Sequence, residues 1–312
     1  MIPHLEAPVA VVCHDAGATN HIVAWLRDTD RPRFIPCLDG PALALWQAAW
    51  GPTPSIPLAQ ALAGARSVLT GTGWASDLEH TARRLARQQG IPSIAVIDHW
   101  TNYRERFVRA GEEILPDAIW VSDAYAKQLA STTFPTIPVT QLPNLYLEEL
   151  VRSVQRHRSQ APAHTGDHLL YVLEPIREAW GPLPQPGEFL ALDYFAQHLD
   201  RISTAATLRI RLRPHPSDPA GKYDAWMARH AHLPVTLDTA DTLAESLTWA
   251  DTVVGCQTYA MVMGLAIGCR VFSSIPPWAP PCVLPHAEII RLSALTGPHP
   301  VSQLTPTLTR EP

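Results

Sequence analysis

The chain has 312 residues, which is more than one average domain and suggests about two. Its apolar runs are too short to span a bilayer, and its start lacks the basic and apolar regions of a signal peptide, so we expect a cytoplasmic protein with no transmembrane segment. The net charge of -5 excludes a basic footprint for nucleic acid, and five scattered cysteines without a Cys-x-x-Cys pair indicate neither a disulfide framework nor a zinc site.

The first half of the chain alternates short apolar runs with helical stretches. Strands are predicted at 9–13, 33–37, 67–70, 93–97, 118–121 and 137–141. Helices are predicted up to residue 26 and at about 41–50, 58–62, 76–89 and 123–130. Ser76 followed by Glu79 fits a capping box that starts the fourth of these helices, and Gly90 fits its end. This alternation is typical of a Rossmann-like domain, here at residues 1–150.

The same pattern restarts after a basic helical stretch at 147–158 and a linker that ends at Gly166. Strands are predicted at 169–173, 208–212 and 234–237, helices at 187–202, 220–230 and 242–249, and a strand-turn-helix-turn-strand unit at 251–274. The fold class is therefore α/β, with a second Rossmann-like domain at residues 165–295. We expect the two domains to face each other across a cleft, and residues 296–312 to form a poorly ordered tail.

The turn after the first predicted strand reads His-Asp-Ala-Gly-Ala. Either Asp15 or His14 suits a general base that takes a proton from a hydroxyl nucleophile. The alternative is that Asp15 caps the following helix and Gly17 only permits the turn. The turn lacks both the Gly-x-Gly-x-x-Gly pattern and a Walker lysine, which disfavours nicotinamide and nucleoside triphosphate binding.

A dense polar and aromatic segment follows the predicted strand at 93–97. It contributes the candidate site residues Asp98, His99, Tyr103, Arg104 and Glu105. Two carboxylates, an imidazole and a phenol in one loop exceed what solubility requires, which favours a site with an acid-base function. The alternative is a surface helix at 103–110 stabilised by Arg-Glu pairs.

The segment Arg-Leu-Arg-Pro-His-Pro ends the predicted strand at 208–212. Pro214 and Pro216 remove backbone donors, so strand pairing stops there and His215 lies at the carboxyl end of the strand, where α/β sheets bind ligands. Arg213 and His215 together suit an anionic ligand such as a phosphate. The alternative is a rigid surface connection with an exposed imidazole.

A second anion site is predicted at the turn Gly-Cys-Gln-Thr-Tyr. Gly255 allows close backbone approach, and Gln257, Thr258 and Tyr259 come at the first turn of a helix, whose free N–H groups and dipole attract phosphate. Glu174 follows a strand of the same domain and suits a ribose or base contact, or a helix cap.

No metal or cofactor is predicted. Asp28 and Asp30 have the Asp-x-Asp form of metal-dependent sugar transferases, but they lie between a helix and a proline and read as a solvated turn. His14, His99 and His215 do not belong to pairs at metal-ligand spacing.

Two Rossmann-like halves with an Arg-Pro-His-Pro turn and a later Gly-Cys-Gln-Thr-Tyr-Ala turn resemble glycosyltransferases of the GT-B fold. The closest likeness is to bacterial sialyltransferases and Kdo transferases, which use CMP-activated sugars. In that group a His-Pro motif contacts the donor's cytidine monophosphate, which implies this role for His215 and Pro216. A later Ser/Thr turn holds the phosphate, which Thr258 matches loosely. The acidic motif of some sialyltransferases is present only as the degenerate Asp15-Ala16-Gly17.

The resemblance implies a metal-independent glycosyltransferase with a nucleotide-activated, CMP-linked sugar donor and a glycan or lipid-linked acceptor. The segments Gly-Trp-Ala-Ser-Asp-Leu-Glu and Asp-His-Trp-Thr-Asn-Tyr-Arg also resemble proteins of bacterial surface-polysaccharide gene neighbourhoods. The alternatives are a nucleotide-sugar hydrolase or epimerase, a CDP-alditol phosphotransferase, and a non-catalytic nucleotide-binding relative.

Overall fold

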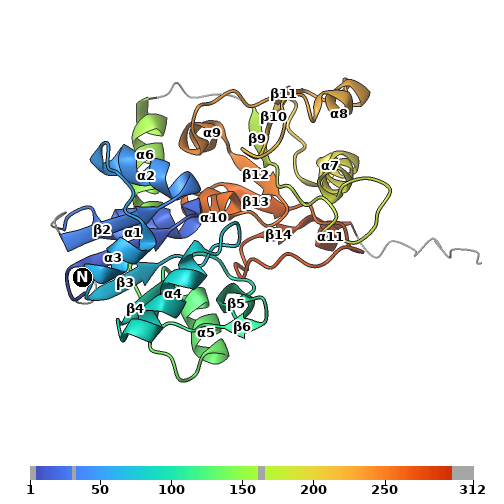
Figure 1. Cartoon of the computed structure of the whole chain (residues 1–312). Coiled ribbons are helices and arrows are strands. Elements are labelled where there is room, and N and C mark those ends of the chain that lie inside the picture. The colour runs from blue at the N-terminus through green and yellow to red at the C-terminus, as the bar shows by residue number, and fades with distance from the viewer. Residues whose placement is uncertain (1–4, 30–32, 161–165, 297–312) are drawn as a thin grey trace, which may run out of the picture. The chain divides into compact units, whose positions relative to one another are not determined.

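The computed structural model describes residues 5–29, 33–160 and 166–296 (Figure 1). The chain divides into two compact units. Unit 1 comprises Met1–Arg152 and Val283–Pro285, and unit 2 comprises Ser153–Cys282 and His286–Pro312. Each unit contains one six-stranded parallel sheet, so the predicted α/β class with two Rossmann-like domains is confirmed. No helix among the described residues is both long and apolar enough to traverse a bilayer.

The sheet of unit 1 has the strand order β2-β1-β3-β4-β7-β8. Its strands are β1 (Val9–Cys13), β2 (Phe34–Leu38), β3 (Ser67–Thr70), β4 (Ser93–Ile97), β7 (Ala118–Val121) and β8 (Val139–Gln141). The helices are α1 (Ala16–Leu26), α2 (Gly40–Trp50), α3 (Leu58–Ala63), α4 (Leu78–Gln89), α5 (Ala124–Thr133) and the first half of α6 (Leu145–Gln160), which continues into unit 2 from Ser153. The short antiparallel pair β5 (Val108–Arg109) and β6 (Glu112–Glu113) stands apart from this sheet.

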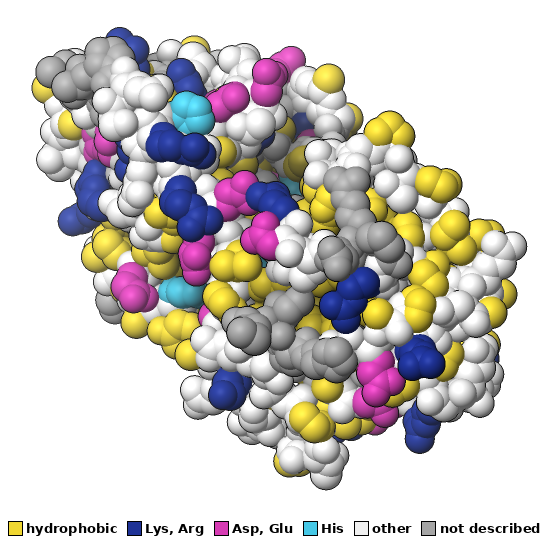
Figure 2. All heavy atoms as spheres, turned by 90° about the vertical axis from the view of Figure 1, so that its left-hand side faces the viewer, with side chains coloured by type: hydrophobic (Ala, Val, Ile, Leu, Met, Phe, Trp, Pro, Cys, Tyr) yellow, Lys and Arg dark blue, Asp and Glu magenta, His cyan; other side chains and the backbone are white. Residues whose placement is uncertain are grey.

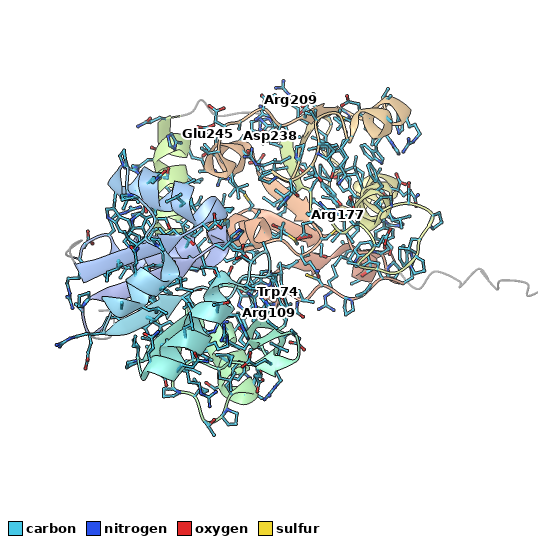
Figure 3. The ribbon with its side chains drawn as sticks, viewed as in Figure 1. Trp74, Arg109, Arg177, Arg209, Asp238 and Glu245 are labelled. Carbon is cyan, nitrogen blue, oxygen red and sulfur yellow. The ribbon has the colours of Figure 1, made fainter. Side chains whose placement is uncertain are left out.

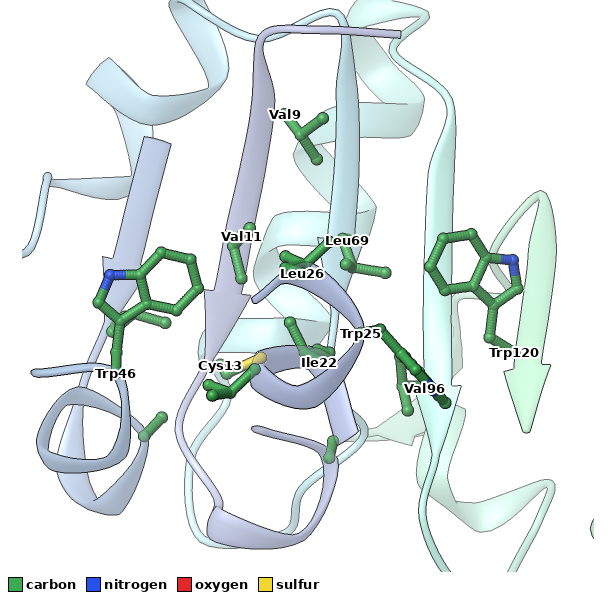
Figure 4. Packing of buried hydrophobic residues seen from close by; sticks show 14 of the residues in the cluster. Val9, Val11, Cys13, Ile22, Trp25, Leu26, Trp46, Leu69, Val96 and Trp120 are labelled. Atoms are coloured by element: carbon green, nitrogen blue, oxygen red, sulfur yellow. The ribbon is translucent and has the colours of Figure 1, made fainter. Parts of the chain in front are cut away.

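The central strand β1 is apolar throughout because both of its faces are covered. Val9, Val11 and Cys13 pack against one layer, where Ile22 and Leu26 of α1 meet them (Figure 4). The alternate residues of the strand, Ala10 and Val12, join a second cluster on the other face, with members from α3 and α4. A two-residue side-chain period in a strand that is buried on both sides produces an unbroken apolar run.

The sheet of unit 2 has the strand order β11-β10-β9-β12-β13-β14. Its strands are β9 (Asp167–Val172), β10 (Leu208–Arg213), β11 (Val235–Leu237), β12 (Thr252–Gly255), β13 (Arg270–Ser273) and β14 (Ile290–Arg291). The helices are α7 (Gly187–Gln197), α8 (Asp224–Arg229), α9 (Leu243–Trp249), α10 (Tyr259–Ala266) and α11 (Leu292–Leu295). The helix predicted at 220–230 is therefore shorter than expected, and the predicted tail lies almost wholly outside the described residues.

Two local predictions in unit 1 are wrong. Glu79 does not complete a capping box with Ser76, because its carboxylate is buried and accepts the backbone N–H of His14 at 3.1 Å. The stretch predicted as an alternative helix at 103–110 is instead a short 3-10 turn, Glu105–Phe107, followed by the β5-β6 pair. At Glu79 a contact with a distant segment replaces the local capping interaction, whereas near residue 108 the chain turns back and pairs with itself, Val108 with Glu113 and Arg109 with Glu112.

The surface charges on the face drawn in Figure 2 are mixed in sign. Lys and Arg side chains are interspersed there with Asp and Glu side chains. All five cysteines are buried free thiols. The mixed charge of this face agrees with the small net charge of the sequence.

One arginine caps the carboxyl ends of two helices in unit 2. The guanidinium of Arg158 donates to the carbonyl oxygens of Leu247, Thr248 and Ala250 at the end of α9, and to that of Ile267 after α10, at 2.5 to 3.3 Å. Terminal carbonyl groups lack partners within their own helix, and a cation is favourable at the negative end of the helix dipole.

Arg158→Met should therefore destabilise the protein by about 3 kcal/mol, because it leaves these carbonyl groups without a charged donor. Urea unfolding measures the change. The matched control is Arg152→Met on the same helix, because the Arg152 side chain is exposed and pairs with Glu148 at 3.8 Å. The control should cost less than about 0.5 kcal/mol. Equal losses in the two variants would contradict the role of Arg158.

Candidate functional site

Each sheet reverses its strand order once, between β1 and β3 in unit 1 and between β9 and β12 in unit 2. At such a reversal the connections leave toward opposite faces, so a crevice opens at the carboxyl ends of the two strands and ligands bind there. The residues predicted from sequence follow β1, β4, β9, β10 and β12. Most of them therefore lie at or next to a reversal.

His14 and Asp15 form a carboxylate–imidazole pair at the reversal of unit 1. Nδ1 of His14 lies 2.7 Å from Oδ1 of Asp15. The second carboxylate oxygen of Asp15 accepts the backbone N–H of Trp74, which follows β3, at 3.0 Å. The Asp15 side chain makes no capping hydrogen bond to α1. Asp15 thus joins the two strand ends and orients the imidazole, so the capping alternative does not describe its side chain.

Two glycines make room for the carboxylates of this site. A Cβ atom on Gly73 would collide with the carboxylate of Asp15, and one on Gly17 would collide with that of Asp98. Asp98 therefore lies against the first turn of α1, where Gly17 is the second residue. Gly17 was predicted as a site residue, and the structure gives it this steric role.

Asp98 is held by a buried arginine. Nη1 of Arg106 lies 3.3 Å from Oδ1 of Asp98, and the same nitrogen donates to the carbonyl oxygen of Thr72 after β3. His99 is partly buried, and its Nδ1 lies 3.3 Å from the hydroxyl of Thr101. Burial lowers the pKa of His99 against the opposing effect of Asp98. Asp98 and His99 thus lie next to the reversal, with Asp98 paired to a buried arginine.

The other predicted residues of this loop point elsewhere. Tyr103 is buried and donates its hydroxyl to the carbonyl oxygen of Ala126 in α5 at 3.4 Å. Arg104 is exposed and pairs with Glu113 of β6 at 2.8 Å. Glu105 is exposed in the 3-10 turn. The structure does not bring these three side chains to the His14–Asp15 pair.

Sequence reasoning missed two residues beside the pair. Glu79 is buried, one of its oxygens has no hydrogen-bond partner among the residues that the structure describes, and burial raises its pKa. Trp74 is 49% exposed, and the guanidinium of Arg109 lies 5.3 Å from its ring centre (Figure 3). Both residues belong to the segment Gly-Trp-Ala-Ser-Asp-Leu-Glu, which the sequence analysis noted, but nothing in that segment indicates a contact with His14 and Asp15, about 60 residues earlier.

In unit 2, the turn that carries His215 is built on Asp218. This carboxylate accepts the backbone N–H of His215 at 3.1 Å and the hydroxyl of Tyr223 at 2.9 Å. Nδ1 of His215 accepts the backbone N–H of Ser217 at 3.2 Å, so the neutral ring carries its proton on Nε2. Burial lowers the pKa of His215; Asp218 opposes this, and the positive charges of Arg177 and Lys222 add to it. Pro216 is exposed beside it.

Arg213, predicted to share an anion with His215, is engaged by its own domain. Its Nη1 donates to Asp238 at 2.6 Å, to Ser246 at 2.7 Å and to the carbonyl oxygen of Ala240 at 3.0 Å. The Asp238 side chain is completely buried. The structure therefore gives Arg213 a structural ion pair and does not direct it toward His215.

The N-terminus of α10 is also occupied by protein groups. Glu174 accepts the backbone N–H of Gln257 at 2.8 Å, and Thr258 is the N-cap, whose hydroxyl accepts the N–H of Ala260. A Cβ on Gly255 would lie 2.9 Å from Val172, so this glycine permits the close approach of β12 to β9. Tyr259 is the first residue of the helix.

Glu174 is a carboxylic acid with an unusual ionisation. Burial raises its pKa from 4.5 to about 7, and the Gln257 N–H partly opposes this. Near neutral pH the group is therefore partly protonated. A protonated carboxyl group does not repel an anion, so Glu174 and the turn before α10 remain compatible with a phosphorylated ligand.

Sequence reasoning also missed a charged network next to His215. Lys222 lies 2.6 Å from Asp218 and 2.6 Å from Glu188, and Glu188 accepts the backbone N–H of Arg177 at 2.6 Å. The Glu-Pro-Ile-Arg-Glu sequence after β9 was the available signal for Arg177.

Within residues 5–29, 33–160 and 166–296, no three His, Cys, Asp or Glu side chains are grouped as metal ligands.

No protein-family model matches the sequence, and no curated protein matches it. Solved structures are similar in fold. One is a UDP-GlcNAc 2-epimerase from Neisseria meningitidis bound to UDP-GlcNAc, with a TM-score of 0.53 and 11% identity over 81% of this chain and 78% of that chain. Another is the glycotransferase of kitacinnamycin, with a TM-score of 0.51 and 16% identity over 92% and 86%. The fold is of the GT-B type, as predicted. Because proteins of this fold catalyse different reactions, the reaction has to be inferred from the site residues.

Glu174→Gln should stabilise the protein in a pH-dependent way. Between pH 4.5 and about 7 the folded state keeps a proton that the unfolded state releases, so the native glutamate loses stability as pH rises through this window. The amide lacks this penalty and still accepts the Gln257 N–H. Its stabilising effect should be larger at pH 8.5 than at pH 5.5 by roughly 2 kcal/mol, measured by urea unfolding.

The matched control for this measurement is Glu178→Gln, in the same loop, because that glutamate is exposed. It should change the free energy of unfolding by less than about 0.5 kcal/mol at both pH values. A gain from Glu174→Gln that is the same at pH 5.5 and pH 8.5 would show that the carboxyl group titrates normally.

Proposed function

We propose that this protein is a metal-independent glycosyltransferase that uses a nucleotide-activated sugar. The observation that carries the proposal is the His14–Asp15 pair at the strand reversal of unit 1. A carboxylate that accepts from Nδ1 of an imidazole holds the tautomer whose Nε2 has a free lone pair, which is the arrangement of a general base. A transferase needs such a base to activate the hydroxyl group of an acceptor.

In this mechanism the donor binds at the carboxyl edge of the unit 2 sheet and the acceptor at that of unit 1. The acceptor oxygen attacks the anomeric carbon as its proton passes to the His14–Asp15 pair. The bond between the anomeric carbon and the donor phosphate breaks, and its electron pair leaves with the nucleotide. His215 offers an Nε2–H to the leaving phosphate, where charge develops in the transition state.

The donor is a nucleotide sugar, and we propose a CMP-linked one in bacterial surface polysaccharide or glycoconjugate synthesis. The fold supports a nucleotide sugar, because the epimerase of similar fold has UDP-GlcNAc bound. The His215-Pro216 motif supports the cytidine monophosphate, by its resemblance to transferases that use CMP-activated sugars. A glycan or a lipid-linked glycan is the proposed acceptor.

Asp15→Asn should lower turnover at least about a hundredfold while nucleotide binding stays nearly unchanged. The amide still accepts from Trp74 and can donate to Nδ1 of His14, so the shape of the turn is kept. The imidazole then carries its proton on Nε2 and no longer accepts one. Turnover of donor and acceptor, with calorimetry of nucleotide binding, measures the two effects.

His99→Ala is the comparison variant, and it should keep turnover within a few-fold of the native protein. If Asp15→Asn is fully active while His99→Ala is inactive, the base belongs to the Asp98–His99 loop. If both variants stay active, the assignment of acceptor activation to unit 1 is wrong.

Calorimetry with CMP, CDP, UMP and UDP tests the donor. We expect CMP to bind most tightly among the four. Binding of uridine nucleotides alone would refute the cytidine assignment and leave the transferase standing. Incubation with the donor alone separates the alternatives: an epimerase or hydrolase converts it without acceptor, a CDP-alditol phosphotransferase requires CDP-alditol, and a non-catalytic relative binds nucleotide and turns nothing over.

A further inference from the structure

Arg177 has an uncommon backbone conformation that its surroundings enforce. Its φ angle is +52°, in the left-handed region that side chains other than glycine rarely adopt. Its N–H donates to Glu188 at 2.6 Å, and its carbonyl oxygen accepts the N–H of Gly187 at 2.8 Å. Both backbone groups are thus bound to the start of α7. Residues held in this way concentrate at ligand sites, because the fold must compensate the cost.

The carboxylate that holds Arg177 belongs to the network that holds His215. Glu188 binds Lys222, Lys222 binds Asp218, and Asp218 accepts the N–H of His215. The Glu188 and Asp218 side chains are 2% and 1% exposed. Ion pairs buried this deeply are costly to break, so the network connects the loop after β9 rigidly to the turn after β10.

The side chain of Arg177 differs from that of Arg213. Arg177 is exposed, and among the residues that the structure describes its guanidinium has no hydrogen-bond or ion-pair partner. Figure 3 labels it in the loop between β9 and α7. In Arg213, by contrast, Nη1 donates to Asp238, to Ser246 and to the carbonyl oxygen of Ala240. Arg213 is thus anchored by an ion pair to a fully buried carboxylate, whereas the whole guanidinium of Arg177 is available to a ligand within the described part of the chain.

We propose that Arg177, together with His215, binds the phosphate of the nucleotide, in the role that the sequence suggested for Arg213. The inference rests on the proposed function, since it names the residues that meet the donor's phosphate. A guanidinium binds a phosphate through two parallel N–H donors, and Nε2–H of His215 adds a third. As the bond to the anomeric carbon breaks, the electron pair goes to a phosphate oxygen, and both groups stabilise the charge there.

The test compares a nucleotide with its nucleoside, so that the contribution of the phosphate is isolated. In Arg177→Gln, the dissociation constant of CMP should rise about tenfold to a hundredfold, because a charged, bidentate donor is lost. The dissociation constant of cytidine should stay within about twofold. Arg209→Gln is the matched control, because Arg209 is also an exposed arginine of the unit 2 sheet (Figure 3). It should change neither constant.

Three outcomes distinguish a wrong phosphate assignment from a wrong proposed function. If the native protein binds CMP and Arg177→Gln binds it equally well, the phosphate assignment is overturned and the transferase proposal stands. If Arg213→Gln remains folded and loses the preference for CMP over cytidine, Arg213 holds the phosphate instead. If the native protein binds none of CMP, CDP, UMP and UDP, both the proposed function and the assignment of Arg177 fail.

Discussion

The single reversal of strand order in each parallel sheet is the constraint on which the candidate sites depend. All strands of such a sheet end at the same edge, but only at a reversal do neighbouring connections leave toward opposite faces. In unit 1 this places the turn after β1 beside the turn after β3, so Asp15 can accept the N–H of Trp74. In unit 2 it places Glu174 beside the turn that begins α10.

Carboxylates act throughout as supports for backbone turns. Five loops each donate a backbone N–H to a carboxylate. The acceptors are Asp15, Asp218, Glu174, Glu188 and Glu79. Where the carboxylate is buried, as in Glu79, Glu188 and Asp218, the loss of such a donor carries a large desolvation cost, so the contact strongly prefers one loop conformation. The loops that result present His14, His215 and Arg177, and the chemistry we propose depends on those three side chains.

The fold is shared with an epimerase and with a glycotransferase, so it does not specify a reaction by itself. What distinguishes a transferase is a base for an acceptor hydroxyl in addition to groups that stabilise a leaving phosphate. The His14–Asp15 pair fits the first requirement, and the rigid connection between Arg177 and His215 fits the second. In the proposed mechanism, unit 1 supplies the base and unit 2 supplies the groups that stabilise the leaving phosphate.

The amino-acid sequence by itself determined the fold class, because local signals suffice for it. The apolar run Val9–Cys13 and the strands Ser67–Thr70 and Ser93–Ile97 agree with prediction residue for residue, since burial on both faces leaves no other pattern. Local patterns also placed His14, Asp15 and His215 at strand ends.

Only the tertiary structure decided which polar groups are free. Arg213 lies two residues from His215 in the sequence, yet it forms an ion pair through Nη1 with the buried Asp238, 25 residues further on. Glu79 fits a capping box with its neighbours, yet it is used by His14, 65 residues earlier. For Arg177 the sequence offers only its place after β9, and the structure shows that the neighbouring Glu188 binds its backbone N–H and Lys222 instead of its guanidinium. Periodicity and capping patterns report interactions within a few residues, whereas a charged side chain takes whichever partner the folded chain brings within about 3 Å.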